Sequence, residues 1–243
     1  MTPVVIIPVY NHEHAIGAVV AQVRKHGLPV LLVDDGSKPS CATVLDGLVK
    51  EPDVRLFRRP QNGGKGAAVI SGLEEAHRLG FTHAVQIDAD GQHDLVDLPR
   101  FLEQATANPD ALITGQPMYD ASVPKGRLYG RYLTHVWVWI NTLSLAIKDS
   151  MCGFRVYPLP RTLAAIVPSI GKRMDFDPEI AVRLVWAGTK VINLPTHVTY
   201  PTDGVSHFDV LWDNVRISGM HTRLFFGMLL RLPSILWRRV FGR

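Results

Sequence analysis

Cysteine is scarce in this sequence of 243 residues. The two cysteines, Cys41 and Cys152, lie far apart and no Cys-x-x-Cys pair occurs, which argues against a structural zinc site and indicates a reducing compartment. Apolar residues make up 47% of the chain and charged residues 20%, as in ordinary globular proteins. Most of the chain is therefore expected to fold around a buried core.

Several standard fingerprints are also absent. The segment Asn62-Gly-Gly-Lys-Gly is not the G-x-x-x-x-G-K-[ST] phosphate loop, and no G-x-G-x-x-G follows the first apolar run. ATPase and dinucleotide-binding functions are thereby disfavoured. No G-x-S-x-G elbow accompanies the ten histidines, which argues against a catalytic triad. The chain starts without a basic leader or a small-residue cleavage site, so we expect a cytoplasmic protein.

Acidic residues disappear after Asp213. The segment 211–243 instead combines six arginines with many apolar and aromatic residues. Such a basic apolar tail is typical of helices that lie on an anionic membrane surface. It is too short to span a bilayer, because Arg231 and Pro233 interrupt the apolar run. The alternative is a terminal helix that packs on the domain and leaves its arginines in solvent.

Apolar runs alternate with amphipathic segments through the first half of the chain. The expected strands are 2–8, 29–33, 54–58, 82–87 and 111–114, and the expected helices include 15–25, 42–50 and 95–107. This rhythm predicts an α/β fold with a mostly parallel sheet covered by helices on both faces. Beyond residue 115 the pattern changes to a long helix at 125–148, a turn into a strand at 149–157, a helix at 176–186 and strands within 191–200.

Polar motifs follow several of these strands. Asp34 and Asp35 end the second strand, Lys65 lies in the glycine-rich loop, and Asp88 and Asp90 end the fourth strand. Ligands of open parallel sheets bind outside the carboxyl ends of the strands, so these loops are expected to share one cleft. Carboxylates are hard oxygen ligands, which suits Asp88 and Asp90 to a divalent cation. Taken alone, the two aspartate motifs are more often ordinary solvated loops or turns.

The second half of the chain supplies candidate bases and phosphate ligands. Asp149, Asp177 and Glu179 are candidate general bases for an acceptor hydroxyl. Arg155 and Arg173 are suited to holding phosphate bidentately, although surface ion pairs are the commoner use of arginine.

In their order and spacing, these motifs give the chain a resemblance to a known family. The motifs are PVYNH at 8–12, VDDGS at 33–37, NGGKGAA at 62–68, DADGQHD at 88–94, CGFR at 152–155 and FDPE at 176–179. Over residues 3–207 the chain resembles glycosyltransferase family 2, inverting enzymes of the GT-A fold that use nucleotide-sugar donors, and within it the dolichyl-phosphate mannose synthase group. The resemblance implies one catalytic domain at 1–210, with a nucleotide-sugar-binding half at 1–115 and an acceptor half at 116–210.

The resemblance also implies site residues. The base and ribose pocket would be lined by Pro8, Tyr10 and Asp35. Lys65, judged by its residue type and position alone, is compatible with neutralising a diphosphate and with capping the glycine-rich loop. Mg²⁺ or Mn²⁺ would be held by Asp88, Asp90 and Gln92.

The chain also departs from the family pattern. His12 replaces a frequent glutamate, Gly115-Gln116-Pro117 replaces Gly-Ser-Arg, and the arginine expected near Pro201 is missing. The candidates to replace these phosphate contacts are Arg127, Arg131, Arg155, Arg173 or His207, and the sequence does not choose among them.

The function expected is transfer of a sugar from a UDP- or GDP-sugar to a lipid-linked acceptor at the inner face of the cytoplasmic membrane. An anionic lipid phosphate would need little help from a base, whereas a hydroxyl would require Asp149, Asp177 or Glu179 to take its proton. The alternatives are a transferase acting on a soluble or glycan hydroxyl and a nucleotide-binding scaffold without activity. No nucleic-acid partner is expected.

Overall fold

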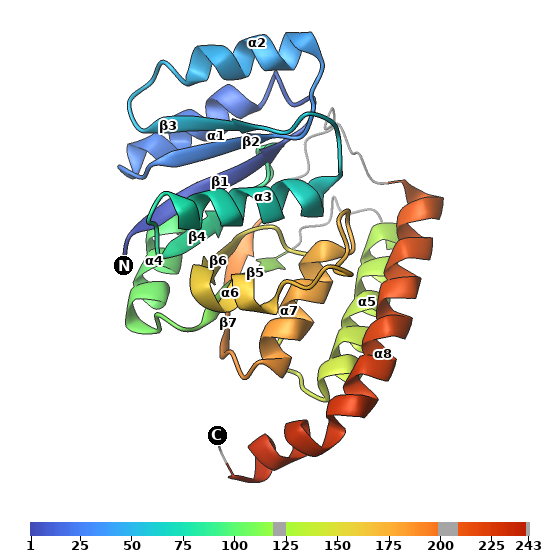
Figure 1. Cartoon of the computed structure of the whole chain (residues 1–243). Helices are drawn as coiled ribbons and strands as arrows, with labels where there is room; N and C mark the ends of the chain where they lie inside the picture. Colours follow the sequence, from blue (N-terminus) through green and yellow to red (C-terminus); the bar gives the residue numbers. More distant parts are fainter. Residues whose placement is uncertain (119–124, 199–208, 242–243) are drawn as a thin grey trace.

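The computed structural model describes residues 1–118, 125–198 and 209–241, and Figure 1 shows them arranged around one sheet. Within these ranges seven strands pair in the order β3-β2-β1-β4-β6-β5-β7. The strands are β1 (Pro3–Val9), β2 (Val30–Asp34), β3 (Val54–Arg58), β4 (His83–Gln86), β5 (Leu112–Met118), β6 (Arg155–Pro158) and β7 (Val191–His197). Strand β6 is antiparallel to β4 and β5, and the other pairs are parallel. The predicted fold class is confirmed.

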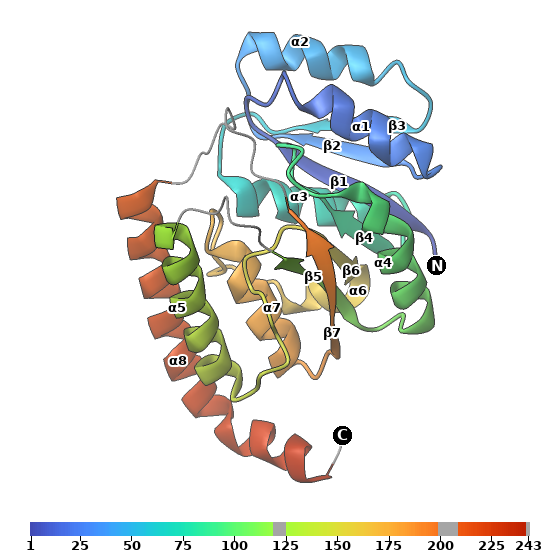
Figure 2. The same ribbon diagram turned by 180° about the vertical axis from the view of Figure 1, so that it is seen from behind.

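Helices cover both faces of this sheet, as Figures 1 and 2 show. They are α1 (Ile16–Lys25), α2 (Pro39–Leu48), α3 (Lys65–Arg78), the 3-10 turn η1 (Leu95–Asp97), α4 (Leu98–Ala107), α5 (Lys125–Thr142), α6 (Leu159–Ala165), α7 (Phe176–Trp186) and α8 (Val210–Phe241). One buried cluster joins the sheet to α1, α2 and α4, and the other joins it to α3, α6 and α7 with α5 and α8 outside them.

Strand β1 shows why the sheet sits between two layers. Val4 and Ile6 belong to the cluster with α3 and α7, whereas Val5 and Ile7 belong to the cluster with α1 and α4. All four are fully buried, because successive side chains of a strand point to opposite faces. A strand that is apolar at every position therefore needs helices on both sides.

Two helix boundaries differ from the prediction. The predicted helix 42–50 begins earlier, at Pro39, where the fixed backbone of proline suits the first turn. The predicted helix 125–148 ends at Thr142, because Leu143 adopts a left-handed backbone with φ of 50°. The shortened helix leaves residues 143–154 as a loop that carries Asp149 into the site described below.

The predicted C-terminal helix is present as α8, which lies beside α5 in both views. Its residues Met220, Leu224 and Met228 are buried in the cluster shared with α7. Pro233 lies inside the helix, which changes direction towards its C-terminal end (Figure 1), as expected where a proline removes a helical hydrogen bond. Within the described ranges, no helix is both long enough and apolar enough to cross a membrane.

Candidate active site

The loops that follow β1 and β2 are joined at the carboxyl edge of the sheet. Asn11, with φ of 55°, follows β1 and its amide N–H donates to Ser37 Oγ at 3.1 Å. The Asn11 Oδ1 accepts from the backbone N–H of Lys38 at 2.8 Å. Pro8 and Tyr10, which were predicted to line a base pocket, are half-buried beside this junction. Their predicted role stays a prediction.

Asp35 fixes the glycine-rich loop to the same edge. Its carboxylate accepts from the backbone N–H groups of Gly63 at 3.0 Å and Gly64 at 2.8 Å, and Arg59 Nε lies 2.9 Å from Oδ1. Burial raises the pKa of Asp35, although the two amides and the guanidinium oppose the shift. In this structure Asp35 positions the loop, and its predicted contact with a nucleoside remains a prediction.

Gly64 allows this loop to lie against the loop before α7. Its φ is +98°, and a Cβ there would come within 2.5 Å of Arg173 Cγ and 2.7 Å of the Lys172 carbonyl oxygen. The side chain of Arg173 is exposed, and its positive charge acts on the carboxylate of Asp35. Arg173 therefore lies at the rim of the glycine-rich loop, where a phosphate would be accessible to it.

The ammonium group of Lys65 joins two carboxylates. Its Nζ lies 2.8 Å from Asp88 Oδ1 and 3.1 Å from Asp177 Oδ2, with 19% of the side chain exposed. On the other side of Asp88, His93 Nε2 lies 3.5 Å from Oδ2. Burial alone would lower the pKa of Lys65, but the carboxylates of Asp177 and Asp88 hold it well above its usual value. Lys65 is therefore a permanent cation at this edge.

Asp88 and Asp90 are in different electrostatic states. Burial alone would raise the pKa of Asp88, but Lys65 and His93 hold it well below the usual range, so Asp88 is ionised. Burial and the neighbouring charge of Asp88 raise the pKa of Asp90, whose Oδ1 accepts from the Gln92 N–H at 3.0 Å. A cation between the two carboxylates would relieve this repulsion.

The donor set at this position suits a hard divalent cation only in part. Asp88 and Asp90 offer carboxylate oxygens and Gln92 an amide oxygen, which are ligands that Mg²⁺ and Mn²⁺ prefer. Among the described residues there is no group of three or more His, Cys, Asp and Glu side chains arranged to hold a metal ion. A ligand such as a diphosphate would therefore have to complete the coordination shell.

Gly153 determines where the Asp88 carboxylate lies. A Cβ on this glycine would come within 2.2 Å of Asp88 Oδ2. The main chain of the loop before β6 thus packs directly on the carboxylate, which no other residue type permits.

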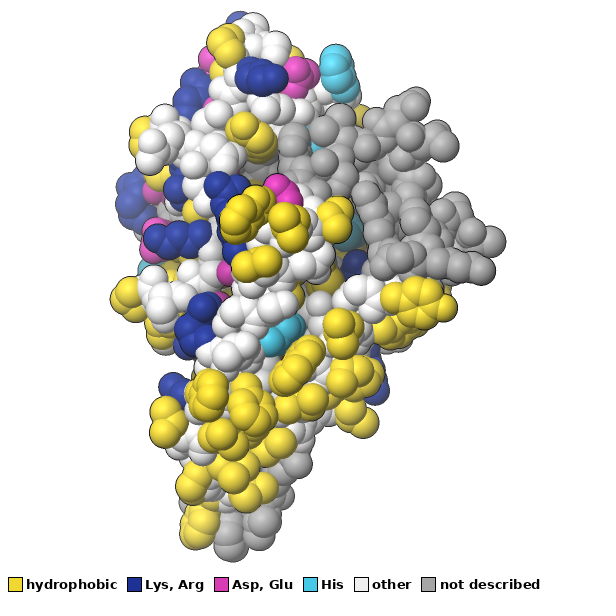
Figure 3. Space-filling view, turned by 90° about the vertical axis from the view of Figure 1, so that its right-hand side faces the viewer, with side chains coloured by type: hydrophobic (Ala, Val, Ile, Leu, Met, Phe, Trp, Pro, Cys, Tyr) yellow, Lys and Arg dark blue, Asp and Glu magenta, His cyan; other side chains and the backbone are white. Residues whose placement is uncertain are grey.

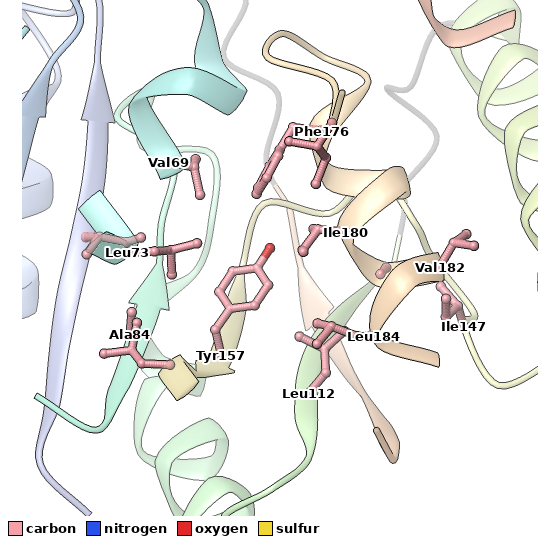
Figure 4. Packing of buried hydrophobic residues seen from close by; sticks show 14 of the residues in the cluster. Val69, Leu73, Ala84, Leu112, Ile147, Tyr157, Phe176, Ile180, Val182 and Leu184 are labelled. Atoms are coloured by element: carbon pink, nitrogen blue, oxygen red, sulfur yellow. The ribbon is translucent and has the colours of Figure 1, made fainter. Parts of the chain in front are cut away.

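Asp177 lies at the end of a buried hydrogen-bond network. Its Oδ1 accepts from Gln86 Nε2 at 3.2 Å, and Gln86 Oε1 accepts from the Tyr157 hydroxyl at 3.2 Å. Figure 4 shows Tyr157 among Ala84, Leu184 and other apolar residues, with its hydroxyl oxygen directed towards the end of α7 that carries Phe176. This network fixes the position of Asp177, which is ion-paired with Lys65.

Arg155 also belongs to this hydrogen-bond network. It is fully buried, and its guanidinium donates to the carbonyl oxygens of Cys152 at 2.8 Å, Ser150 at 2.6 Å and Asp177 at 2.6 Å, and to Tyr157 Oη at 3.3 Å. These contacts favour a structural role over the predicted phosphate contact, because they use all its nitrogens inside the protein.

Glu179 and Asp149, two of the predicted bases, are ion-paired. Glu179 is fully buried and accepts from Arg183 at 2.7 Å, from Arg223 of α8 at 2.7 Å and from the Gly171 N–H at 2.9 Å. The Asp149 carboxylate makes two hydrogen bonds with Arg131, at 2.6 and 2.7 Å.

The surroundings of Asp149 make it a weak base. Its Oδ2 lies 3.3 Å from Nε2 of His135, a neighbour on α5 of its partner Arg131. Burial alone would raise the pKa of Asp149, but Arg131 and His135 hold it well below the usual range. His207 and the side chain of Arg127, which were also predicted to contact phosphate, lie outside the described residues.

Comparison with known proteins identifies the family. Residues 4–157 match the family model described as glycosyl transferase family 2. The chain belongs to glycosyl transferase family 2. It is 30% identical over 221 residues to the polyprenol monophosphomannose synthase of Mycolicibacterium smegmatis, covering 83% of this chain and 79% of that protein. It is 27% identical over 207 residues to the undecaprenyl-phosphate mannosyltransferase of Micrococcus luteus, covering 80% and 82%.

Solved structures support the fold of this family 2 protein. Glucosyl-3-phosphoglycerate synthase from Mycobacterium tuberculosis, in complex with Mn²⁺ and uridine-diphosphate-glucose, superposes with a TM-score of 0.65. The similarity covers 93% of this chain and 78% of that one at 14% sequence identity. At that identity the likeness establishes the GT-A-type fold, in agreement with the prediction.

Three residues of this family 2 site were not singled out by sequence reasoning. Gly153 lay within a quoted motif, but nothing in the sequence indicated that Asp88 would pack on it. Gln86 and Tyr157 are central to the Asp177 network, yet they occupy ordinary positions in apolar strands. A polar residue inside an otherwise apolar buried strand was the available signal, because such a group needs an internal partner.

Proposed function

We propose that the protein transfers a sugar from a UDP- or GDP-sugar to a polyprenyl phosphate, with inversion at the anomeric carbon and with Mg²⁺ or Mn²⁺ on the donor. The observation that carries this proposal is the convergence of Lys65, Asp88 and Asp90 at the carboxyl edge of the sheet. Relatives named as polyprenol- and undecaprenyl-phosphate mannosyltransferases support a lipid phosphate as acceptor.

In the proposed site, Asp88, Asp90 and Gln92 would hold the metal on the donor diphosphate. The metal would offset charge on the departing nucleoside diphosphate. Lys65 and Arg173 flank the glycine-rich loop and add positive charge on the same side. An oxygen of the acceptor phosphate bonds to the anomeric carbon, and the bond from that carbon to the diphosphate breaks with its electron pair.

The state of the three predicted bases favours an anionic acceptor. Asp149 is paired with Arg131, Asp177 with Lys65, and Glu179 with two arginines. A carboxylate that is ion-paired with a cation is a weak proton acceptor, because the cation stabilises its charged form. A phosphate needs no deprotonation by any of them. The rival function, transfer to a soluble or glycan hydroxyl, would require one of these pairs to open.

Membrane attachment is the second part of the proposal. Figure 3 shows apolar side chains gathered over the lower part of the face formed by α5 and α8. On α5 the exposed apolar residues recur at helical spacing, and α8 adds a second row. The two rows, which we call the apolar face, comprise Tyr129, Tyr132, Leu133, Val136, Trp137 and Ile140 of α5 and Leu211, Trp212, Val215, Phe226, Leu229, Leu230, Leu236 and Trp237 of α8.

The composition of the apolar face suits the surface of a bilayer. It mixes Trp and Tyr with aliphatic residues, as side chains at the membrane–water interface do. The tail has no acid after Asp213, which favours an anionic leaflet. Its arginines are in part used internally, since Arg223 pairs with Glu179 and Arg231 lies 4.8 Å over the Trp186 ring. We therefore propose that the protein is peripheral at the inner face of the cytoplasmic membrane, held mainly by apolar contacts.

Product formation from a panel of UDP- and GDP-sugars, assayed with undecaprenyl phosphate and with a glycan acceptor, tests the proposal. We expect radiolabelled lipid product with one donor, in the presence of Mn²⁺ and not after chelation. Asp90→Ala should abolish the product, whereas Asp110→Ala, which removes an exposed carboxylate elsewhere, should not. Product on the glycan alone would establish the hydroxyl-acceptor function, and nucleotide binding without transfer from any donor would establish the inactive scaffold.

A further inference from the structure

The ammonium group of Lys65 is paired with a carboxylate oxygen that the proposed metal site requires. It is the first residue of α3, directly after the glycine-rich loop, and its ammonium lies 2.8 Å from Asp88 Oδ1. A second carboxylate, Asp177, shares the same ammonium at 3.1 Å. The free enzyme thus already holds a cation on Asp88. A divalent cation on that carboxylate would lie within a few ångströms of Lys65 and repel it.

We propose that Lys65 is a resident counter-cation that leaves Asp88 when the metal–diphosphate complex binds, and that Asp177 is the positioning residue that keeps the ammonium in the site. This inference rests on the proposed metal site. It gives Asp177 a role different from that of a general base.

The surroundings of the two partners of Lys65 differ in a way that supports this exchange. The side chain of Asp177 is 6% exposed and is fixed by Gln86 Nε2, and its main-chain oxygen accepts from the buried Arg155. Asp88 is 23% exposed and lies in the loop after β4, beside Asp90. The inner carboxylate is therefore the fixed anchor, and the outer one faces incoming ligands.

The lysine side chain is suited to moving between them. Its charge is compact and its four-carbon stem is flexible, so Nζ can leave Asp88 while remaining near Asp177. The diphosphate of the donor is the anion that the released ammonium would meet. Without Asp177, the whole ammonium charge would remain on Asp88 and compete with the metal.

The exchange predicts effects of opposite sign on two ligands. Lys65→Met should increase the affinity for Mn²⁺ alone by about tenfold, because the competing cation is gone. The same variant should decrease the affinity for UDP or GDP in saturating Mn²⁺ by about tenfold, because a phosphate contact is lost. Asp177→Asn should decrease the affinity for Mn²⁺ alone severalfold, and in the Lys65→Met background that decrease should vanish.

Electron paramagnetic resonance of free Mn²⁺ measures the first affinity, and calorimetric titration with UDP and with GDP measures the second. Lys172→Met, which removes an exposed charge from the neighbouring loop, is the matched control and should change Mn²⁺ affinity less than about twofold. Thermal unfolding identifies variants that do not fold. If Lys65→Met does not fold, Asp177→Asn is sufficient to test the exchange. Unchanged or tighter Mn²⁺ binding by the Asp177→Asn variant overturns the exchange.

Two further results distinguish a failure of the exchange from a failure of the proposed function. Mn²⁺ binding by the wild type, together with unchanged or weaker binding by Lys65→Met, overturns the exchange and leaves the proposed function intact. A wild type that does not bind Mn²⁺ even with UDP or GDP overturns the proposed metal site, and the exchange with it.

Discussion

The carboxyl edge of the sheet and the α5–α8 pair use their charged residues in opposite ways. At the edge, Lys65 and Asp88 lie partly exposed where a ligand could reach them. On α8, Arg223 and Arg231 are engaged by Glu179 and Trp186, and apolar side chains face outward instead. Exposure does not separate the two regions, because the side chain of Lys65 is 19% exposed and that of Arg223 is 43% exposed. The difference is that the edge places its ion pair beside Asp90, whereas α8 uses its ion pair to join two helices. The number of charges in a segment therefore does not indicate its role.

The largest effect is expected from breaking the edge at Gly153. Gly153→Ala places a methyl group 2.2 Å from Asp88 Oδ2, so the carboxylate or the loop must move. Misplacing such a group by about 1 Å should lower kcat/KM by about a hundredfold or more. Steady-state kinetics with the identified donor checks this.

Gly47→Ala on α2 is the matched control, since nothing lies within 4 Å of a Cβ there. That variant should keep its activity and unfold at a slightly higher temperature, because alanine favours a helix. Near-normal activity of Gly153→Ala would show that the position of Asp88 is not important for transfer.

Glu179→Gln should destabilise the packing of α8, because Glu179 of α7 is the ion-pair partner of Arg223. The change removes a fully buried charge and leaves Arg183 and Arg223 without a carboxylate, so we expect a loss of about 3 kcal/mol in the free energy of unfolding. Urea unfolding followed by circular dichroism measures it.

Arg223→Gln gives the comparison for this loss. The side chain of Arg223 is 43% exposed, so its removal should cost no more than about 1 kcal/mol by itself. If Glu179→Gln instead keeps full stability and loses only kcat, Glu179 is a catalytic base and not an anchor.

The apolar face gives a smaller and separable effect. A glutamate in place of Val136 on α5 or Phe226 on α8 should weaken binding to anionic vesicles by about 2 kcal/mol each, or about thirtyfold. Vesicle co-sedimentation measures it. Val96→Glu is the control, because Val96 is 80% exposed but lies outside the apolar face. If only the Phe226 variant of α8 binds vesicles more weakly, α5 is not part of the membrane contact.

These tests avoid truncating the tail, which would confuse attachment with folding. Met220, Leu224 and Met228 of α8 are buried in the main cluster, so removal of the tail from Leu224 onward would expose the core. Surface substitutions leave that core intact.

Local pattern was sufficient to predict most of the fold. The alternation of apolar strands and helices predicted the parallel sheet, and helix α7 has the predicted bounds, 176–186. The antiparallel placement of β6 between β4 and β5 was not predictable, because it depends on pairing between strands distant in sequence. The division of the domain at residue 115 also stays a prediction, and β5 crosses that boundary.

The site was predictable in its location more than in its roles. Strand ends located Asp35, Lys65 and Asp88, because topology brings such ends to one edge. The sequence did not reveal that Asp177 holds Lys65 or that Arg155 is fully buried, since both depend on contacts across the fold. A sequence does not distinguish a charged residue that binds a ligand from one that forms an internal ion pair.

The smallest effect concerns pH and the contact between α5 and α8. His221 of α8 is buried against Asn141, and burial lowers its pKa to about 4 from an ordinary value of 6.5. The unfolded chain therefore binds a proton between these values while the folded protein does not, so stability falls as pH decreases below 6.5. The contribution of His221 should lower the free energy of unfolding at pH 5.5 relative to pH 7.5 by about 1 kcal/mol.

Urea unfolding at the two pH values measures this difference, and His221→Gln provides the comparison. Glutamine keeps a polar side chain facing Asn141 but does not titrate, so the contribution of this site to the pH dependence should disappear. Lowered pKa values of Asp88 and Asp149 act only below about pH 4, because their ordinary value is 3.8, and so do not enter this window. An unchanged pH dependence in His221→Gln would show that the α5–α8 contact is not the acid-sensitive part of the fold.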